Sequence, residues 1–118
     1  TVLTSLDMYD FAEIGLSGSS NDQVIRLANL AKESGLDGVV CSPREIEIIR
    51  NEFGPNFKIL TPGIRPSWAE HADQKRVVSP SEALVKGADY LVIGRPITGA
   101  DDPAAAVKLI EDELKDVG

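Results

Sequence analysis

Hydrophobic positions along the chain fall into two patterns that alternate with one another. Short apolar runs at residues 36–41, 57–61 and 90–93 are typical of buried strands of a parallel sheet. A further strand-like run occupies residues 1–5. Between these runs, apolar residues recur with helical spacing. Four strands that alternate with helices predict an α/β fold with a parallel sheet and right-handed crossovers.

Polar residues indicate where the first helices begin. Residues 9–14 could form one or two helical turns. Ser20, with Gln23 as its capping-box partner, predicts the start of a longer helix that stops near Gly35. The expected buried stripe of that helix is Val24, Leu27, Ala28 and Ala31.

The tetrapeptides SPRE (residues 42–45) and SPSE (residues 79–82) predict the starts of two more helices. The first should end at Gly54 and the second at Gly87. Asp102 and the proline after it predict the last helix, and long loops are expected at residues 62–78 and 94–101. The expected inward positions are Ile46, Ile49 and Phe53 in one helix and Val107, Ile110 and Leu114 in the last.

Composition places the chain among ordinary soluble domains, or pieces of one. It has 118 residues, of which 42% are hydrophobic and 26% charged, and its apolar runs are far shorter than a membrane helix needs. The net charge of -7 argues against nonspecific binding to nucleic acid or an anionic membrane. A single cysteine, Cys41, excludes an internal disulfide and a multi-cysteine metal site. With no signal peptide visible, we expect a cytoplasmic protein.

Two arginines lie where a parallel α/β fold usually binds its ligands, in the loops that follow strands. Arg95 follows Gly94 directly after the last strand, and Arg65 lies in the run TPGIRP at residues 61–66. The guanidinium group presents a fixed fork of donors that suits phosphate, and glycine allows close approach of the backbone. The pattern favours a phosphate site over two turns with solvated arginines. Gln74 could donate to a phosphate and to a base or sugar, or belong to a mobile polar surface.

Other conspicuous residues are interpreted as structural. His71, the single histidine, is expected to be an exposed bystander, and Trp68 should pack the long loop down. Cys41 follows an apolar strand and should be a small core residue. The acidic stretch at residues 111–116 is expected to be a solvated helix face. The sequence contains no nucleophilic triad, no HExxH zinc motif and no nucleotide-binding glycine loop.

Four strings, taken together, resemble one family closely, the bacterial orotidine 5'-monophosphate decarboxylases. In order they are LDGVVCS (36–42), TPGIRP (61–66), DQKRV (73–77) and GRPIT (94–98). The resemblance runs from residue 1 to the end and corresponds to the C-terminal half of the family's chain. It implies a TIM barrel, a homodimer, and conversion of orotidine 5'-monophosphate to uridine 5'-monophosphate and CO2 without a cofactor.

The resemblance also implies roles for particular residues. Arg95 with Gly94 would hold the 5'-phosphate, and Arg65 would help to close the phosphate loop. Gln74 would bridge the phosphate and the pyrimidine. Thr4 would lie beside the pyrimidine, and Pro62 would pack against the base.

One departure from the family is large. The family's catalytic array, an Asp-x-Lys-x-x-Asp motif after the third strand, is absent from the sequence; the string that begins at Asp73 has Val78 where the second aspartate is required. A full barrel needs eight strands and about 250 residues. Residues 1–118 are therefore expected to form one half-barrel, strands five to eight, with binding residues but no catalytic residue.

Three hypotheses follow from this reading. The chain is the binding half of a decarboxylase, a fragment or a designed truncation whose other half is separate. Alternatively, it is a non-catalytic half-barrel that associates with itself, because an open half exposes strand edges and an apolar face. The third is a related barrel, such as a 3-keto-gulonate phosphate decarboxylase, although DQKRV and TPGIRP favour the pyrimidine enzyme.

Overall fold

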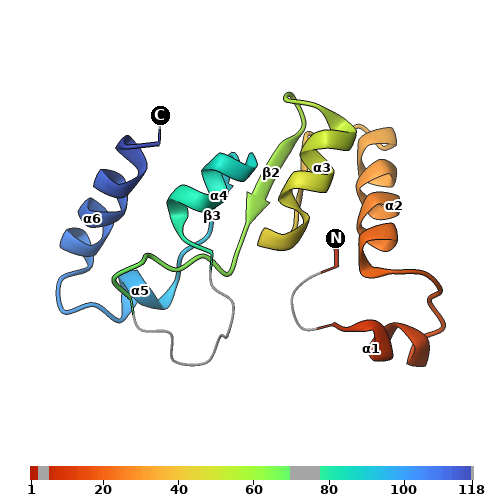
Figure 1. Ribbon diagram of the computed structural model, residues 1–118, viewed down its shortest axis with the longest axis horizontal. Coiled ribbons are helices and arrows are strands. Elements are labelled where there is room, and N and C mark those ends of the chain that lie inside the picture. The colour runs from red at the N-terminus through yellow and green to blue at the C-terminus, as the bar shows by residue number, and fades with distance from the viewer. Residues whose placement is uncertain (3–5, 70–77, 118) are drawn as a thin grey trace.

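Helices and parallel strands alternate along most of the chain (Figure 1). The computed structural model describes residues 1–2, 6–69 and 78–117. The described elements are α1 (Met8–Glu13), α2 (Ser20–Glu33), β1 (Gly38–Val40), a 3-10 turn (Pro43–Glu45), α3 (Ile46–Phe53), β2 (Lys58–Thr61), α4 (Pro80–Lys86), β3 (Tyr90–Leu91), α5 (Arg95–Thr98) and α6 (Pro103–Lys115). Within these residues no helix is long and apolar enough to cross a membrane.

The sheet has its strands in sequence order, β1-β2-β3, and both pairs are parallel. Val40 pairs with Leu60, which pairs in turn with Tyr90. Bonds from Cys41 N to Leu60 O (3.1 Å) and from Val92 N to Thr61 O (2.9 Å) extend the ladder past the strand ends. Parallel strands in sequence order are the arrangement of consecutive units in a β/α barrel, and one half of a doubly wound sheet has the same order.

The prediction of four strands is wrong for the described residues, which form three. Residues 3–5 of the expected first strand lie outside the described residues. Thr1 nevertheless lies against β1, because its ammonium group and its hydroxyl both donate to Val40 O, at 3.0 and 2.9 Å. These two bonds come from one residue and do not make a ladder, so the described residues 1–2 form no strand. The observed strands are also shorter than the apolar runs that predicted them.

The first two helices are confirmed, with a shift at the start of α2. The Ser19 hydroxyl accepts from Asp22 N (3.1 Å) and Asp22 Oδ2 accepts from Ser19 N (3.2 Å), so the capping box begins one residue before Ser20. This register turns Gln23 inward, where its Nε2 donates to Ser17 O at 2.8 Å. Val24 and Ala28 are buried as predicted, whereas Leu27 is 42% exposed.

The two serine-proline starts behave differently. At SPSE the Ser79–Glu82 capping box forms as predicted, and α4 ends at Gly87 in the left-handed region (φ 114°). At SPRE, Ser42 makes no capping bond and residues 43–45 form a 3-10 turn before α3. Ser42 is buried at the end of β1, and its carbonyl accepts from Glu45 N in a tight turn instead. Gly54 ends α3 as predicted.

The segment at residues 94–101, expected to be a loop, contains the single-turn helix α5. Its bonds run from Ile97 N and Thr98 N to Gly94 O and from Gly99 N to Arg95 O. Asp102 caps α6 through Ala105 N at 3.1 Å, which confirms the predicted start of the last helix. Ile110 is buried on α6, but Val107 is 38% exposed, because Ala106 instead faces inward.

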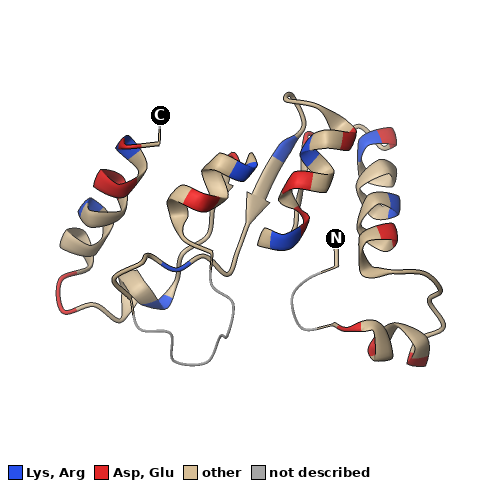
Figure 2. Cartoon of the chain, viewed as in Figure 1, with Lys and Arg blue, Asp and Glu red and all other residues tan. Residues whose placement is uncertain are grey.

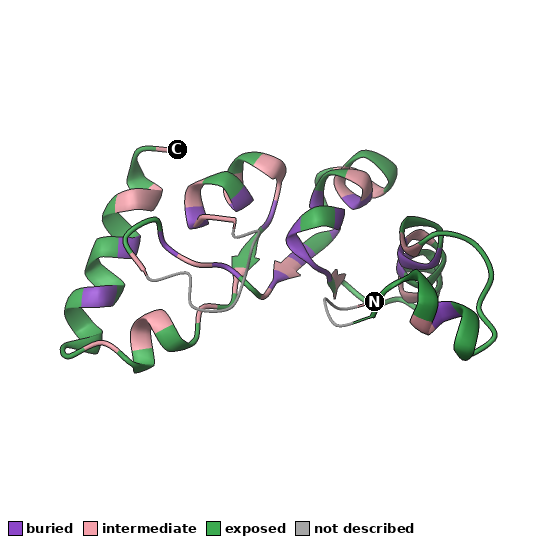
Figure 3. Ribbon diagram, turned by 60° about the horizontal axis from the view of Figure 1, so that its bottom comes forward, coloured by how far each residue is buried: buried purple, intermediate pink, exposed green. Residues whose placement is uncertain are grey.

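One face of the sheet and the helices that cover it form the core (Figure 3). The buried core residues are Val24, Ala28, Cys41, Ile46, Ile49, Phe57, Ile59, Ile64, Ala83 and Ala88. Val39, Leu91 and Ile93 pack against them from the same side of the strands. Cys41 is fully buried, as predicted.

The opposite face of the sheet carries apolar side chains that none of the described helices covers. Because side chains alternate along a strand, Val40, Leu60, Tyr90 and Val92 share this face. Tyr90 is 56% exposed and Val92 47% exposed. The radius of gyration is 15.5 Å, against about 13.5 Å for a compact domain of this length. The fold is thus open on one side of its sheet.

Arg50 ties together the edge of the sheet at which the strands begin. From α3 it donates to the carbonyl groups of Gly54, Phe57 and Gly87, at 2.6–3.1 Å. Its Nη2 also pairs with Asp89 Oδ2 at 2.7 Å, and the same oxygen accepts from Ile59 N at 2.9 Å. This network fixes the starts of β2 and β3 and leaves the opposite strand ends to the loops.

Candidate functional site

A hollow of about 250 Å³ lies where β2 and β3 end. It is lined by Gly63, Ile64, Arg65, Val92, Gly94, Arg95 and Pro96. The lining comes from the two loops in which the sequence placed its candidate arginines. Parallel β2 and β3 bring their carboxyl ends to one edge, which is why loops far apart in sequence meet here.

The backbone around Arg65 is held on both sides. Ile64 is 2% exposed and forms a parallel bridge with Val78, and Arg65 N donates to Val78 O at 3.1 Å. Gly63 has a φ of +73°, a conformation that an L-residue adopts only with strain. The loop after β2 therefore presents Arg65 from a defined backbone position. The side chain of Arg65 is half-buried.

Gly94 and Arg95 form the other wall. Arg95 is exposed and begins α5, and Gly94 precedes it. A Cβ placed on Gly94 would have no heavy atom within 4 Å, and the φ of Gly94 is -103°. Contacts within the described chain thus leave open space beside this glycine, on the side where a ligand could approach the backbone.

The local charge of the hollow is positive although the chain as a whole is acidic. Figure 2 shows basic segments on the loop after β2 and at α5, with acidic residues concentrated on the helices and at the start of α6. Among the described residues, the lining contains two arginines and no carboxylate. Such a site can hold an anion through charge-assisted, forked hydrogen bonds.

Three of the predicted site residues, Arg65, Gly94 and Arg95, are therefore brought together by the structure. Pro62 is half-buried and precedes Gly63, but it does not line the hollow. Thr4 and Gln74 lie outside the described residues, as does His71. Gly63, Ile64, Val92 and Pro96 complete the lining; each lies within two residues of a predicted residue, which is the signal that could have identified them.

The described residues offer little else for a ligand or metal. Among them no group of three His, Cys, Asp or Glu side chains could hold a metal ion. Trp68 is 44% exposed, so it covers its loop only in part.

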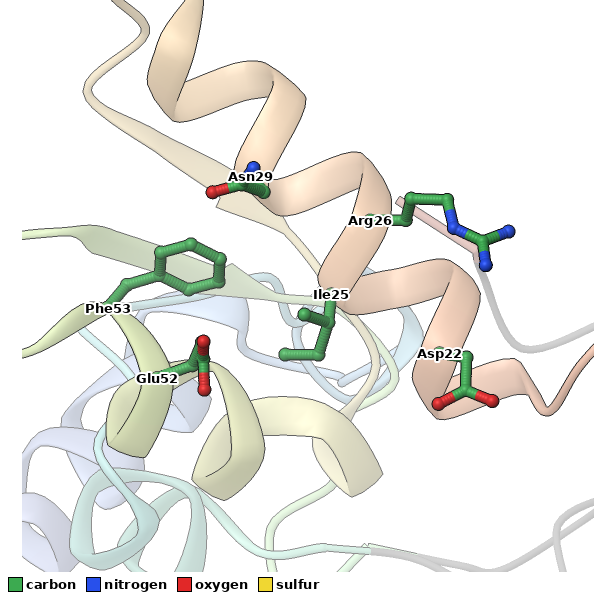
Figure 4. A pocket seen from close by; sticks show the side chains of 6 residues that line it. All are labelled: Asp22, Ile25, Arg26, Asn29, Glu52 and Phe53. Carbon is green, nitrogen blue, oxygen red and sulfur yellow. The ribbon is translucent and has the colours of Figure 1, made fainter.

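A larger hollow of about 450 Å³ lies between α2 and α3, on the outer side of the helical layer (Figure 4). Ile25 and Phe53 form its apolar part, with Glu52 on α3 and Asp22 and Asn29 on α2. Arg26 points away from α3 in Figure 4. This groove is remote from the strand ends, and its mixed charges select no ligand.

A cluster of buried polar groups lies at the ends of β1 and β2, on the helix-covered side. Burial raises the pKa of the Cys41 thiol to about 11; the Thr61 hydroxyl beside it opposes this shift and Glu45 adds to it. Burial also raises the pKa of Glu45, although its own backbone N–H and Arg44 oppose that change. With a pKa of about 11 the Cys41 thiol stays protonated, so it is a poor nucleophile at neutral pH.

Comparison with known proteins agrees with this geometry. The family model described as "Orotidine 5'-phosphate decarboxylase / HUMPS family" matches residues 1–110. Orotidine 5'-phosphate decarboxylase from Vibrio parahaemolyticus is 56% identical over 114 residues, which are 97% of this chain and 49% of the relative. The enzyme from Actinobacillus succinogenes is 54% identical over 117 residues, 99% of this chain and 50% of the relative.

A solved structure shows the same arrangement of elements. The crystal structure of orotidine 5'-phosphate decarboxylase from Lactobacillus acidophilus superposes with a TM-score of 0.80 at 39% identity, over 97% of this chain and 46% of that one. The chain spans about half the length of the curated relatives it matches. From the matched residues 1–110, the chain belongs to the orotidine 5'-phosphate decarboxylase / HUMPS family.

Proposed function

We propose that the chain is the C-terminal, phosphate- and pyrimidine-binding half of an orotidine 5'-phosphate decarboxylase, which converts orotidine 5'-monophosphate to uridine 5'-monophosphate (UMP) and CO2. The observation that carries the proposal is the hollow where Arg65 and Arg95 meet at neighbouring strand ends. It presents two guanidinium groups in an otherwise acidic chain. Relatives more than 50% identical to the chain bear the name of this enzyme.

In this proposal each residue has a separate role. Arg95 and the open backbone at Gly94 hold the 5'-phosphate, and Arg65 closes over it from the loop after β2. Gln74 bridges the phosphate and the pyrimidine. Pro62 packs against the base and Thr4 lies beside it. The last three assignments rest on the sequence alone.

The isolated chain should bind nucleotide without decarboxylating it. Decarboxylation leaves a carbanion at C6 of the pyrimidine, and a lysine must lie close enough to protonate it. The family's Asp-x-Lys-x-x-Asp array, which supplies that lysine, is missing from the sequence. The remaining chemistry of this half is electrostatic grip and placement of the substrate.

The partner in this proposal is the other half of the barrel. Residues 1–118 would supply its fifth to eighth strands, in the cytoplasm. Matched relatives are about twice as long as the chain. The uncovered face formed by Val40, Leu60, Tyr90 and Val92 would become the barrel interior, and the edges of the sheet would find partners.

Nucleotide binding by the chain tests the proposal directly. UMP affinity is measured by calorimetry at low ionic strength for wild type, Arg95→Ala and Arg26→Ala, the last being an exposed arginine remote from the hollow. Loss of a charge-assisted phosphate contact should cost about 1.5–3 kcal/mol, or roughly 10- to 150-fold in affinity. Arg26→Ala should bind like wild type. Equal affinities for wild type and Arg95→Ala would show that the hollow is not the phosphate site.

Turnover tests the division of labour between the halves. Orotidine 5'-monophosphate decarboxylation is assayed with the chain alone and after addition of the N-terminal half of a relative. We expect no activity alone and recovery on mixing. Turnover by the chain alone at the level of an intact relative would contradict the assignment of the catalytic lysine to the other half.

The exposed apolar sheet face favours one second candidate, a self-associating half-barrel without catalysis. Two copies could cover each other's open faces and pair their edges. Sedimentation separates the possibilities. A folded monomer at micromolar concentration would refute self-association and leave the binding-half proposal unaffected.

A further inference from the structure

The carboxyl group of Glu45 is buried in the turn that follows the end of β1. Glu45 is 7% exposed and closes the 3-10 turn that follows β1. Its Oε2 atom is buried and has no hydrogen-bond partner among the described residues. Burial of this oxygen disfavours the ionised form and raises the pKa of Glu45, although its own backbone N–H and Arg44 compensate in part.

Cys41 and Thr61 connect this carboxyl group to the next strand. Cys41 lies near both Glu45 and Thr61, since each of them acts on its thiol. The Thr61 hydroxyl is buried and makes no hydrogen bond of standard length within the described chain; the thiol beside it is only a weak partner. Three polar groups thus fill one buried layer with little hydrogen bonding to stabilise a charge.

Few charged groups face this layer. Arg44, on the same turn, favours the ionised form of Glu45. On the side of Cys41, the Thr1 ammonium group at the end of β1 and Arg50 of α3 favour the thiolate. Of these charged groups, only Arg44 acts on Glu45 directly and lowers the pKa that burial raises, and Arg44 is itself exposed to solvent.

Thr61 is also the last residue of β2 and the first of the TPGIRP loop. Its carbonyl accepts from Val92 N at 2.9 Å, on the strand that leads to Gly94 and Arg95. Two residues beyond it, Gly63 begins the lining of the hollow. A displacement of Thr61 would therefore reach both walls of the hollow through continuous backbone.

We propose that Glu45 is a positioning residue for the hollow: its charge state sets the packing of the Cys41–Thr61 layer and, through Thr61, the placement of the loop that carries Arg65. The neutral acid keeps the layer closed. Ionisation draws the turn toward solvent and loosens the loop. Because the folded pKa of Glu45 lies above its ordinary value of 4.5, its stabilising contribution is complete below that pH and is lost as pH rises through the folded value.

Trp68, the chain's single tryptophan, reports on this loop without any ligand. Its emission is titrated from pH 4 to 8 in wild type, E45Q and E47Q, all in a His71→Gln background that removes the nearby imidazole. E45Q mimics the neutral acid, and E47Q removes an exposed carboxylate two residues away. We expect the Trp68 emission to change above pH 4.5 in wild type and in E47Q, and to show no such transition in E45Q.

The UMP affinities of wild type, E45Q and E47Q are compared at a pH below the transition and at a pH above it. Wild type should bind less tightly relative to E45Q at the higher pH, while E47Q should follow wild type. This arm rests on the proposed function, whereas the Trp68 titration does not. Absence of UMP binding would refute the proposed function alone and leave the tryptophan titration to decide the role of Glu45.

The proposal is overturned if E45Q and wild type give the same Trp68 titration, or if wild-type emission is constant across the range. Urea unfolding at pH 5 first establishes that each variant is folded. Should E45Q not fold, E45D retracts the carboxyl group by one methylene and should move the Trp68 midpoint. An unmoved midpoint in E45D would then overturn it.

Discussion

Replacement of Arg50 by methionine tests whether one side chain holds together the edge of the sheet at which the strands begin. Arg50 is 19% exposed and reaches the ends of α3 and α4 and the starts of β2 and β3. Methionine keeps most of the length and apolar stem of arginine. The variant removes the guanidinium fork and leaves the carbonyl groups of Gly54, Phe57 and Gly87 without that donor.

The expected loss follows from these contacts. A typical intramolecular hydrogen bond contributes about 1 kcal/mol net, so three lost carbonyl contacts amount to about 3 kcal/mol. The partly exposed pair with Asp89 adds no more than about 1 kcal/mol. Retained packing of the stem offsets a fraction of the sum. We expect Arg50→Met to lower the free energy of unfolding by about 2–4 kcal/mol, a large share of the stability of a small domain.

Urea unfolding followed by circular dichroism measures this loss. With an m-value of about 1–3 kcal/mol per molar urea, the midpoint should fall by roughly 1–2 M. Arg50→Lys should retain only part of the lost stability, because one ammonium group cannot reach all three carbonyl groups. Arg26→Met, at an exposed site on α2, is the matched control and should unfold like wild type. A midpoint for Arg50→Met equal to that of the control would refute the assignment of this network to stability.

Three other outcomes are expected. Gly38→Ala should destabilise by about 1–3 kcal/mol or more in urea unfolding, since its Cβ would clash with Lys58 O. Gly94→Ala should leave unfolding unchanged and weaken UMP binding. Cys41 should react with a thiol reagent only as fast as the fold opens, because it is buried with a pKa of about 11; reaction at the rate of a free thiol would contradict this. Burial alone would raise the pKa of Asp89, but bonds from Ile59 N–H and Arg50 hold that pKa below 3.8. The stabilising effect of the Asp89 carboxylate is therefore present above pH 3.8 and is lost below it. Asp89→Asn should remove this loss, so the free energy of unfolding should vary less with pH in the acid range.

Local signals in the sequence predicted which helices form better than they predicted the residues that cap them. Ser79 with Glu82, Gly87 and Asp102 marked helix ends correctly, because a cap is satisfied by residues within one turn. The predicted caps at Ser20 and Ser42 were wrong, because a neighbouring arrangement forms in place of each. At Ser19 a rival capping box forms, and at Ser42 burial at the strand end replaces the cap.

The candidate site was predictable to the same degree. Arg65 and Arg95 could be placed at strand ends, because parallel strands that follow buried apolar runs all end at one edge. The burial of the Glu45 carboxyl could not be predicted, since SPRE indicated only that Glu45 is the glutamate of a capping box at a helix start. Its burial depends on a 3-10 turn that packs against Cys41.

By itself, the sequence determined the alternation of strands and helices, the helix ends governed by local caps, and the family; the anion site that it indicates stays a prediction. Each depends on residue identity and on spacing within a few residues. Only the tertiary structure decided that three described strands pair in sequence order, that one sheet face stays uncovered, and that the two arginines line one hollow. These features depend on which distant segments pack together, and that free energy is distributed over the whole fold.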